Sequence, residues 1–170
     1  MWYAIQVFTG KEQETIELFL GCIGEAYKFI NPQMERMRRY RGKWHKERVV
    51  MFPGYVFIDT EDISGFLADS VKVPRLMKVL GAENKPIPIK QHEADVLKRL
   101  VNDEYVLTFS KGIKTGDRLV VSSGSLIGME ALIKKIDRHK RLATIEVPMF
   151  GRIVETVVGL EVLIDVHKEA

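Results

Sequence analysis

The sequence changes character near Gly116, and this change limits the fold more than any other feature. Before it, strand-forming runs alternate with segments in which apolar residues recur every three or four positions, as in amphipathic helices. After it, short strand-forming runs separated by tight turns fill about 55 residues. The pattern therefore predicts an α+β domain followed by a small all-β barrel.

Domain boundaries follow from the same change. We expect a first domain over residues 1–107, a linker over residues 108–114 that contains Ser110 and Gly112, and a second domain over residues 115–170. A chain of 170 residues is long enough for two small domains. Its hydrophobic content of 46% is normal for a globular protein and too high for a disordered chain.

Local signals predict the individual elements. Thr9 is expected to cap a helix over residues 11–26, with Glu12 completing a capping box. Pro53 and Gly54 bend the chain before a run with strong strand preference. The remaining expected helices cover residues 63–70 and 90–105, and the expected strands cover residues 2–8, 34–41, 44–50, 49–58, 71–80, 118–121, 131–136, 142–147, 152–157 and 160–164.

Two basic clusters stand out in a chain whose net charge is only +3. The first has two opposing carboxylates and the second has one, so each is locally cationic. Such clusters predict contact with a polyanion, and a solvated charged turn is the alternative for each. The clusters comprise Arg36, Arg38, Arg39, Arg41, Lys43, Lys46 and Arg48, and Lys134, Lys135, Arg138, His139, Lys140 and Arg141.

Catalytic and metal-binding motifs are missing from the sequence. It contains no phosphate-binding loop, no dinucleotide-binding glycine pattern and no nucleophile elbow. Its four histidines include no pair at helical spacing, and the lone Cys22 excludes an internal disulfide. We therefore expect a binding protein that is not an enzyme and needs no cofactor or metal.

Membrane and secretion signals are missing as well. No apolar run approaches the roughly 18 to 20 residues that a membrane helix needs. The N-terminus begins with strand-forming residues and lacks the basic start and apolar core of a secretory signal. We expect a cytoplasmic protein with no membrane partner, which a single cysteine fits.

Three segments, taken in order, resemble the NusG family of transcription elongation factors. They are the opening run from Trp2 through Thr9-Gly10-Lys11-Glu12, the run Phe52-Pro53-Gly54-Tyr55-Val56-Phe57, and Phe150-Gly151-Arg152. The third is preceded by Gly116-Asp117-Arg118-Leu119-Val120-Val121. The resemblance spans essentially the whole chain. It implies a monomer with an N-terminal NGN domain, a linker and a C-terminal KOW domain, which is a small SH3-like barrel.

The resemblance also implies a binding surface for RNA polymerase. In the family, the NGN domain binds the clamp helices of the polymerase through an exposed apolar patch. The alternative is that Phe52 and Tyr55 are core residues of the sheet, although strand alternation turns some of these side chains outward. The residues that match the patch are Trp2, Met51, Phe52, Pro53 and Tyr55.

The basic hairpin beside this patch is expected to contact the non-template DNA strand through phosphates, with Tyr40 and Trp44 available for stacking. A solvated, disordered hairpin tip is the alternative. The residues of the predicted DNA contact are Arg36, Arg38, Arg39, Arg41 and Lys43.

The KOW segment departs from the usual family pattern by gaining positive charge. Its first loop carries Ser122-Ser123-Gly124-Ser125 where the family often has an acidic-Gly-Pro-Phe loop, and Lys134 and Lys135 stand where acidic residues are common. These departures resemble specialised paralogs of the LoaP type, which act on long operons and use a leader RNA hairpin. The residues expected to bind RNA are Arg118, Lys134, Lys135, Arg138, His139, Lys140, Arg141 and Arg152.

The predicted function is operon-specific, processive transcription antitermination, with the NGN domain on RNA polymerase and the KOW domain on a nascent RNA hairpin. The alternative is a housekeeping NusG whose KOW domain binds Rho or a ribosomal protein, and Phe150 matches the aromatic residue that the family uses for those partners. A translation-associated protein on ribosomal RNA is a third interpretation, against which the NGN-like half argues. The strong strand preference of the KOW segment predicts a permanent barrel and not a helical hairpin.

Overall fold

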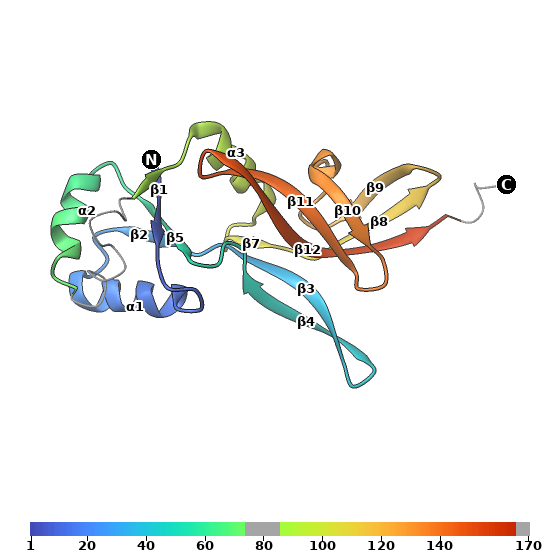
Figure 1. Ribbon diagram of the computed structural model, residues 1–170, viewed down its shortest axis with the longest axis horizontal. Coiled ribbons are helices and arrows are strands. Elements are labelled where there is room, and N and C mark those ends of the chain that lie inside the picture. The colour runs from blue at the N-terminus through green and yellow to red at the C-terminus, as the bar shows by residue number, and fades with distance from the viewer. Residues whose placement is uncertain (74–85, 166–170) are drawn as a thin grey trace. The chain divides into compact units, whose positions relative to one another are not determined.

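The computed structural model describes residues 1–73 and 86–165 of the chain. Helices and strands alternate in its first part, and its last part is almost entirely β-strand (Figure 1). The expected mixture of helices and sheets is therefore confirmed.

The chain divides into two compact units, and each unit is built from two separate stretches. The first unit comprises Met1–Asn31 and Phe52–Ala94, and the second comprises Pro32–Met51 and Asp95–Ala170. The basic hairpin thus belongs to the same unit as the β-rich C-terminal segment. The domain boundaries at residues 107 and 115 stay a prediction.

The first unit is built on a four-stranded antiparallel sheet with the strand order β2-β5-β1-β6. Aromatic and β-branched residues predominate in β5, one of its two central strands, which pairs with the other, β1, along the full length of both. The elements of this unit are β1 (Trp2–Gln6), α1 (Glu12–Ile23), β2 (Lys28–Ile30), β5 (Tyr55–Asp59), α2 (Ile63–Ser70) and β6 (Ile87–Pro88).

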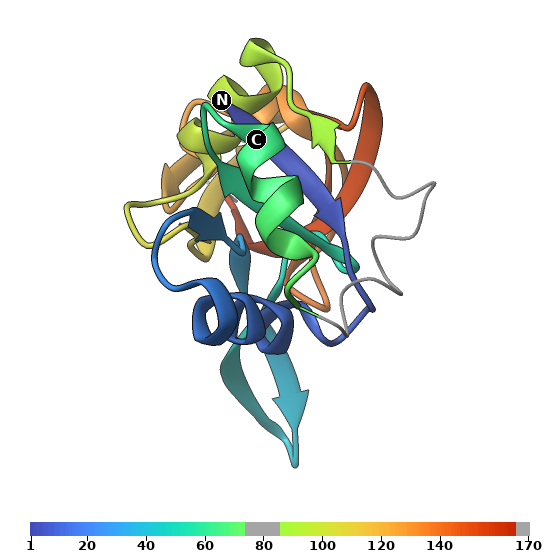
Figure 2. The ribbon, with the colours of Figure 1, turned by 90° about the vertical axis from the view of Figure 1, so that its left-hand side faces the viewer.

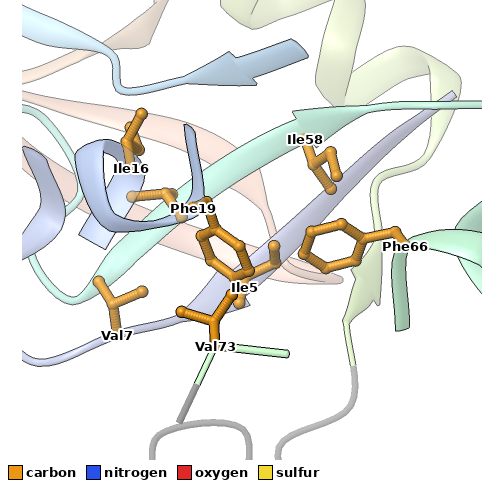
Figure 3. Close-up of a cluster of buried hydrophobic side chains, with 8 residues drawn as sticks. Ile5, Val7, Ile16, Phe19, Ile58, Phe66 and Val73 are labelled. Atoms are coloured by element: carbon orange, nitrogen blue, oxygen red, sulfur yellow. The ribbon is translucent and has the colours of Figure 1, made fainter. Parts of the chain in front are cut away.

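Both helices pack on one face of this sheet, and Figure 2 shows α2 in front of β1 and β5 with α1 beside it. Alternate residues of β1 and β5, such as Ile5 and Ile58, point to that face and meet Phe19 of α1 and Phe66 of α2 (Figure 3). Phe19 and Phe66 are fully buried with ring centroids 5.3 Å apart. This cluster is the hydrophobic core of the first unit.

Helix α3 (Gln91–Leu100) begins where the Glu93 carboxylate accepts a hydrogen bond from the Lys90 N–H at 3.0 Å. It ends five residues earlier than predicted, because Asn102 stops it. The Asn102 side-chain oxygen accepts hydrogen bonds from the backbone N–H groups of Glu104 and Val106, both at 3.0 Å. Such Asx turns compete with the helical hydrogen bonds.

The second unit contains a five-stranded sheet with the strand order β10-β11-β12-β8-β9. The long strand β12 pairs antiparallel with β11 through its first part and parallel with β8 through its last part. It joins the two halves of the sheet without a break, so one strand replaces the two predicted at residues 152–157 and 160–164. The elements are β8 (Ser110–Thr115), β9 (Arg118–Ser123), the 3-10 turn η1 (Glu130–Leu132), β10 (Ile133–Asp137), β11 (Leu142–Met149) and β12 (Arg152–Ile164).

A three-stranded sheet in the same unit carries the basic hairpin, in the order β4-β3-β7. It comprises β3 (Gln33–Tyr40), β4 (Lys43–Val50) and the short β7 (Val106–Leu107), which pairs parallel with β3. Arg41 and Gly42 close the hairpin with φ of 50° and 75°. Positive φ at both loop residues gives the type I′ turn that matches the twist of the two strands.

Two expectations about the elements need correction, and a third, the closed barrel, is not confirmed. The predicted linker is mostly strand, because Ser110–Thr115 forms β8 between β12 and β9. Thr9 does not cap α1, whose N-cap is Lys11 with no side-chain hydrogen bond. Among the strand pairs of the described residues, none joins β9 to β10, so the closed barrel stays a prediction. The strand predicted at residues 71–80 lies mostly outside the described residues.

Candidate functional site

The turn over residues 52–55 buries most of the aromatic surface that was predicted to bind RNA polymerase. Trp2, Met51 and Phe52 are only 5%, 2% and 3% exposed. The ring centroids of Trp2 and Phe52 lie 6.2 and 5.7 Å from that of Phe57. The three rings lie on the sheet face opposite to the one that α1 and α2 cover. The expectation of an exposed patch at these three residues is therefore wrong, because Phe57 draws Trp2 and Phe52 into a buried aromatic cluster.

A buried carboxylate holds this turn in place. Glu12 is 3% exposed, and its Oε1 accepts hydrogen bonds from the Gly54 N–H at 2.8 Å and from the Gly10 N–H at 3.1 Å. The carbonyl of Gly54 in turn accepts the Val7 N–H at 2.8 Å. Gly54 has a φ of 85°, and a Cβ there would lie 3.2 Å from Thr9 Oγ1. The positive φ therefore favours glycine at position 54, and the two N–H groups favour an oxygen acceptor at position 12.

The apolar surface that remains accessible at this end of the β1–β5 pair is different from the predicted one. Pro53 is exposed and Tyr55 is half-buried, with its hydroxyl accepting a hydrogen bond from Gln6 Nε2 at 3.3 Å. Phe8 is 61% exposed in the loop after β1. Sequence reasoning missed Phe8 by extending the first strand to it, whereas β1 ends at Gln6.

The basic hairpin is partly neutralised near its base. Arg36 Nε donates to Glu47 Oε1 at 2.8 Å, and Arg48 lies 4.0 Å from the carboxylate of Glu35. Toward the tip, Arg38, Arg39, Arg41 and Lys43 are exposed, and the Arg41 guanidinium stacks on the ring of Tyr40 at 5.2 Å from the ring centroid. The residues of the predicted DNA contact therefore lie along one hairpin, with free charge concentrated toward its tip.

The turn between β10 and β11 meets this hairpin within the second unit. The guanidinium of Arg141 lies 4.4 Å from the centroid of the Trp44 ring, a cation–π distance. The turn is shaped by Asp137, whose carboxylate accepts the Lys140 N–H at 3.1 Å, and by the positive φ of 55° at Arg141. Arg138, His139 and Lys140 are exposed around it. Two basic clusters that are far apart in the sequence thus come together.

Lys134 is held by acidic neighbours, in contrast to the residues of that turn. Its ammonium group donates a hydrogen bond to the carboxylate of Glu155 and lies 3.7 Å from that of Glu146. The bond to Glu155 raises the pKa of Lys134 above its ordinary value. Sequence reasoning could not find this pairing, because Glu146 and Glu155 stand on the next two strands.

The other residues predicted to bind RNA do not join the β10–β11 turn. Arg152 pairs with Met149 at the far end of β11, seven residue steps from Leu142, which is roughly 24 Å along a strand. Phe150 lies in that same far turn with a φ of 60°. Arg118 begins β9 and pairs with Thr115. The residues predicted to bind RNA are thus divided among the strand β10 and three separate turns.

An exposed apolar row crosses three strands of the five-stranded sheet. Leu163 of β12 pairs with Ile113 of β8, which pairs with Val120 of β9, so the three side chains share one face. They are 61%, 44% and 49% exposed. Sequence reasoning missed this row because it assigned Ile113 to a linker.

Two further classes of site are absent from the described part of the chain. In residues 1–73 and 86–165, no group of three or more histidine, cysteine, aspartate or glutamate side chains could hold a metal ion. Over the same residues, no helix combines the length and apolar character needed to cross a membrane.

Comparison with known proteins identifies the family. A family model described as "Transcription termination factor nusG" matches residues 1–98. The chain is similar to the transcription termination/antitermination protein NusG of Pasteurella multocida, with 31% identity over 164 residues that cover 89% of this chain and 87% of that protein. It is also similar to the protein of the same name from Bacillus subtilis, with 27% identity and 94% of each chain covered.

A solved structure titled "Domain interaction in Thermotoga maritima NusG" is 25% identical and covers 94% of this chain and 92% of that chain, with a TM-score of 0.40. The family model and the Pasteurella relative are sufficient for assignment. The chain belongs to the NusG family of transcription termination/antitermination factors. This is a family of transcription factors and not of enzymes.

Proposed function

We propose that this NusG-family chain is an operon-specific antitermination factor that binds RNA polymerase with its N-terminal domain and a structured nascent RNA with its C-terminal domain. It works where RNA polymerase works, in the bacterial cytoplasm, as a monomer. The observation that carries the RNA contact is the cationic β10–β11 turn, where Arg138, His139 and Lys140 are exposed and Arg141 stacks on Trp44.

The polymerase contact is proposed at the end of the β1–β5 pair where β1 ends and the turn over residues 52–55 leads into β5. Phe8 and Pro53 are exposed there and Tyr55 is half-buried, so the three supply accessible apolar surface of the kind that suits a protein interface. Trp2 and Phe52 support this surface from beneath through Phe57. In this proposal the buried residues position the turn, and the polymerase clamp helices contact the exposed ones.

Antitermination follows from holding both partners at once. The N-terminal domain keeps the polymerase clamp closed, and the C-terminal domain captures RNA as it emerges. The covalent connection gives the second contact a high effective concentration, so neither contact needs to be tight alone. Recruitment to particular operons then depends on the RNA structure that the C-terminal domain recognises.

A protein partner for the C-terminal domain is a second candidate function. The row formed by Leu163, Ile113 and Val120 is an exposed apolar strip on a sheet face, and such strips favour protein contacts over nucleic acid. A housekeeping factor would use it, or Phe150, to bind Rho or a ribosomal protein. The RNA proposal and this one are separable, because the basic turn and the apolar row involve different strands.

The test is an RNA-binding titration with the full chain. Fluorescence anisotropy would compare the leader RNA of the chain's own neighbouring operon with a scrambled RNA of equal length and composition. The proposal expects a preference for the structured leader that persists at physiological salt. Equal binding of both RNAs that disappears as salt rises would be ordinary phosphate attraction, and it would refute RNA-directed recruitment.

A further inference from the structure

The second unit contains a groove between the basic hairpin and the β10–β11 turn, two features that the sequence suggested for different nucleic acids. Its volume is about 380 Å³. The hairpin lines one side with Arg36, Arg38, Arg39 and Trp44, and the turn lines the other with Lys140 and Leu142. We propose that this groove is one composite site for a polynucleotide, in which the hairpin and the turn bind the same strand. The inference rests on the proposed nucleic-acid function and locates it.

The charges in the groove favour a polyanion. Three arginines and one lysine line it, against the single carboxylate of Glu47. Glu47 is already paired with Arg36. Among the described residues, Arg38, Arg39 and Lys140 take part in no ion pair, and all three are exposed. An excess of cations in one concave surface attracts phosphates and raises the rate of encounter.

The groove also offers surfaces for bases. Trp44 is half-buried, and Arg141 packs over its ring at 4.4 Å. Arg141 is itself held by Glu161 at 3.9 Å and by the hydrogen bond from the Leu160 N–H to its carbonyl oxygen at 3.0 Å. The stack therefore links the hairpin to the edge of the five-stranded sheet. Aromatic rings and guanidinium planes are the groups on which unpaired bases stack.

The cationic surface continues beyond the hairpin onto the sheet. A second, smaller groove of about 180 Å³ shares Lys140 and Leu142 with the first and extends to Lys135, Asp137 and Thr144, so two lysines and one carboxylate line it. An extended ligand with repeated negative charge fits such a track better than a compact anion does.

The geometry of the second unit keeps the two sides of the groove together. At Gly159 of β12 a Cβ would lie 2.7 Å from the carbonyl oxygen of Glu35 and 3.0 Å from the Cα of Arg36, so the hairpin strand passes directly over this glycine. The Glu35 carboxylate also accepts the Phe109 N–H at 3.1 Å. The hairpin is thus fixed to β12 at its base and does not project from an independent part of the chain.

Charge-removing variants of the full chain test the composite site. Arg39→Gln removes a cation from the hairpin side and Lys140→Gln removes one from the turn side. Arg152→Gln is the matched control, because it removes an exposed cation at the far end of β11. The probes are a fluorescein-labelled RNA stem–loop and a DNA stem–loop of the same sequence, and the tighter one identifies the nucleic acid that the groove takes.

The composite site predicts that both groove variants weaken binding of the same probe by at least about fivefold and lower its salt slope by about one. Arg152→Gln should bind as the unaltered chain does. Trp44→Phe should abolish any change in tryptophan fluorescence on binding, since only the buried Trp2 then remains. If only the turn variant loses affinity for RNA, the hairpin is not part of the site and the inference is wrong.

Other outcomes separate this inference from the proposed function. If the unaltered chain binds neither probe, the proposed RNA contact fails together with the groove. If it binds RNA and both groove variants retain full affinity, only the inference fails. Equal loss in Arg152→Gln, or displacement of the probe by polyglutamate at matched charge, would also overturn it. Equal loss in Arg152→Gln would mean that binding is diffuse charge attraction. Displacement by polyglutamate would mean that the groove takes an acidic protein ligand.

Discussion

Replacing Glu12 with alanine should loosen the turn over residues 52–55 and destabilise the first unit. Glu12 is buried, and one of its oxygens accepts the N–H groups of both Gly54 and Gly10. Alanine removes the acceptor and leaves the buried Gly54 N–H without it, whereas the N–H of the exposed Gly10 can bind water instead. The change therefore acts on the loop that presents Pro53 and Tyr55.

The magnitude follows from the two bonds. A hydrogen bond to a charged group contributes roughly 1.5–3 kcal/mol, and part of this is recovered when the loop relaxes toward water, so Glu12→Ala should cost about 3 kcal/mol of unfolding free energy. Glu12→Gln keeps an oxygen acceptor without the charge and should cost about 1 kcal/mol.

The assay is urea denaturation followed by tryptophan fluorescence in a Trp44→Phe background, in which Trp2 reports on the first unit. Glu14→Ala is the matched control, because Glu14 stands in the same first turn of α1 but is 58% exposed and pairs with Lys11 on the surface. An exposed pair of this kind contributes about 0–1 kcal/mol. The control also removes the favourable interaction of a carboxylate with the helix N-terminus.

Equal stability of the Glu12 and Glu14 variants would refute the reasoning. It would mean that the buried carboxylate does not hold the turn and that the loop keeps its shape through Gly54 and the aromatic cluster alone. A loss confined to Glu12→Ala, together with weaker binding to RNA polymerase, would support the account.

Three further predictions concern other parts of the chain. Gly159→Ala should cost about 2 kcal/mol in urea denaturation and weaken nucleic-acid binding, because its Cβ would lie 2.7 Å from a backbone oxygen of β3. Phe52→Ala should cost about 3 kcal/mol as a core truncation, whereas Phe8→Ala should leave stability unchanged and reduce polymerase capture in a pull-down. The Lys72 ammonium donates a hydrogen bond to the Asp69 carboxylate and lowers the pKa of that carboxyl in the folded chain. The pair therefore stabilises the fold fully at pH values above the pKa that Asp69 has in the unfolded chain, and this stabilisation is lost as the pH falls through the lower pKa of the folded chain. NMR titration should show a higher pKa for Asp69 in Lys72→Met.

Local signals predicted several elements of this fold. The helix expected at residues 63–70 is α2, which spans Ile63–Ser70, and the turn at Gly42 closes the expected hairpin. These features depend on capping residues, glycine conformations and apolar spacing within a few positions, which a sequence displays directly. The strand β8 was missed because Ser110, Lys111 and Gly112 resemble a linker until β12 pairs with them.

The sites could be predicted only in part, because their properties depend on distant contacts. Phe52 is buried because Phe57 and Trp2 point to its side of the sheet. Lys134 is paired with Glu155 from another strand. It is therefore not a free cation, although the sequence places it among the basic residues expected to bind RNA. The stack of Arg141 on Trp44 joins positions almost a hundred residues apart, and no local pattern indicates it.

The most direct test of the central claim is in vitro transcription with RNA polymerase on templates that carry a terminator downstream of the chain's own operon leader. A parallel template carries a scrambled leader of equal length. RNA-directed antitermination predicts that the protein increases read-through on the native leader and much less on the scrambled one, and that Lys140→Gln removes this difference. Equal read-through on both templates would contradict recruitment by RNA and would favour a factor that acts on every transcript.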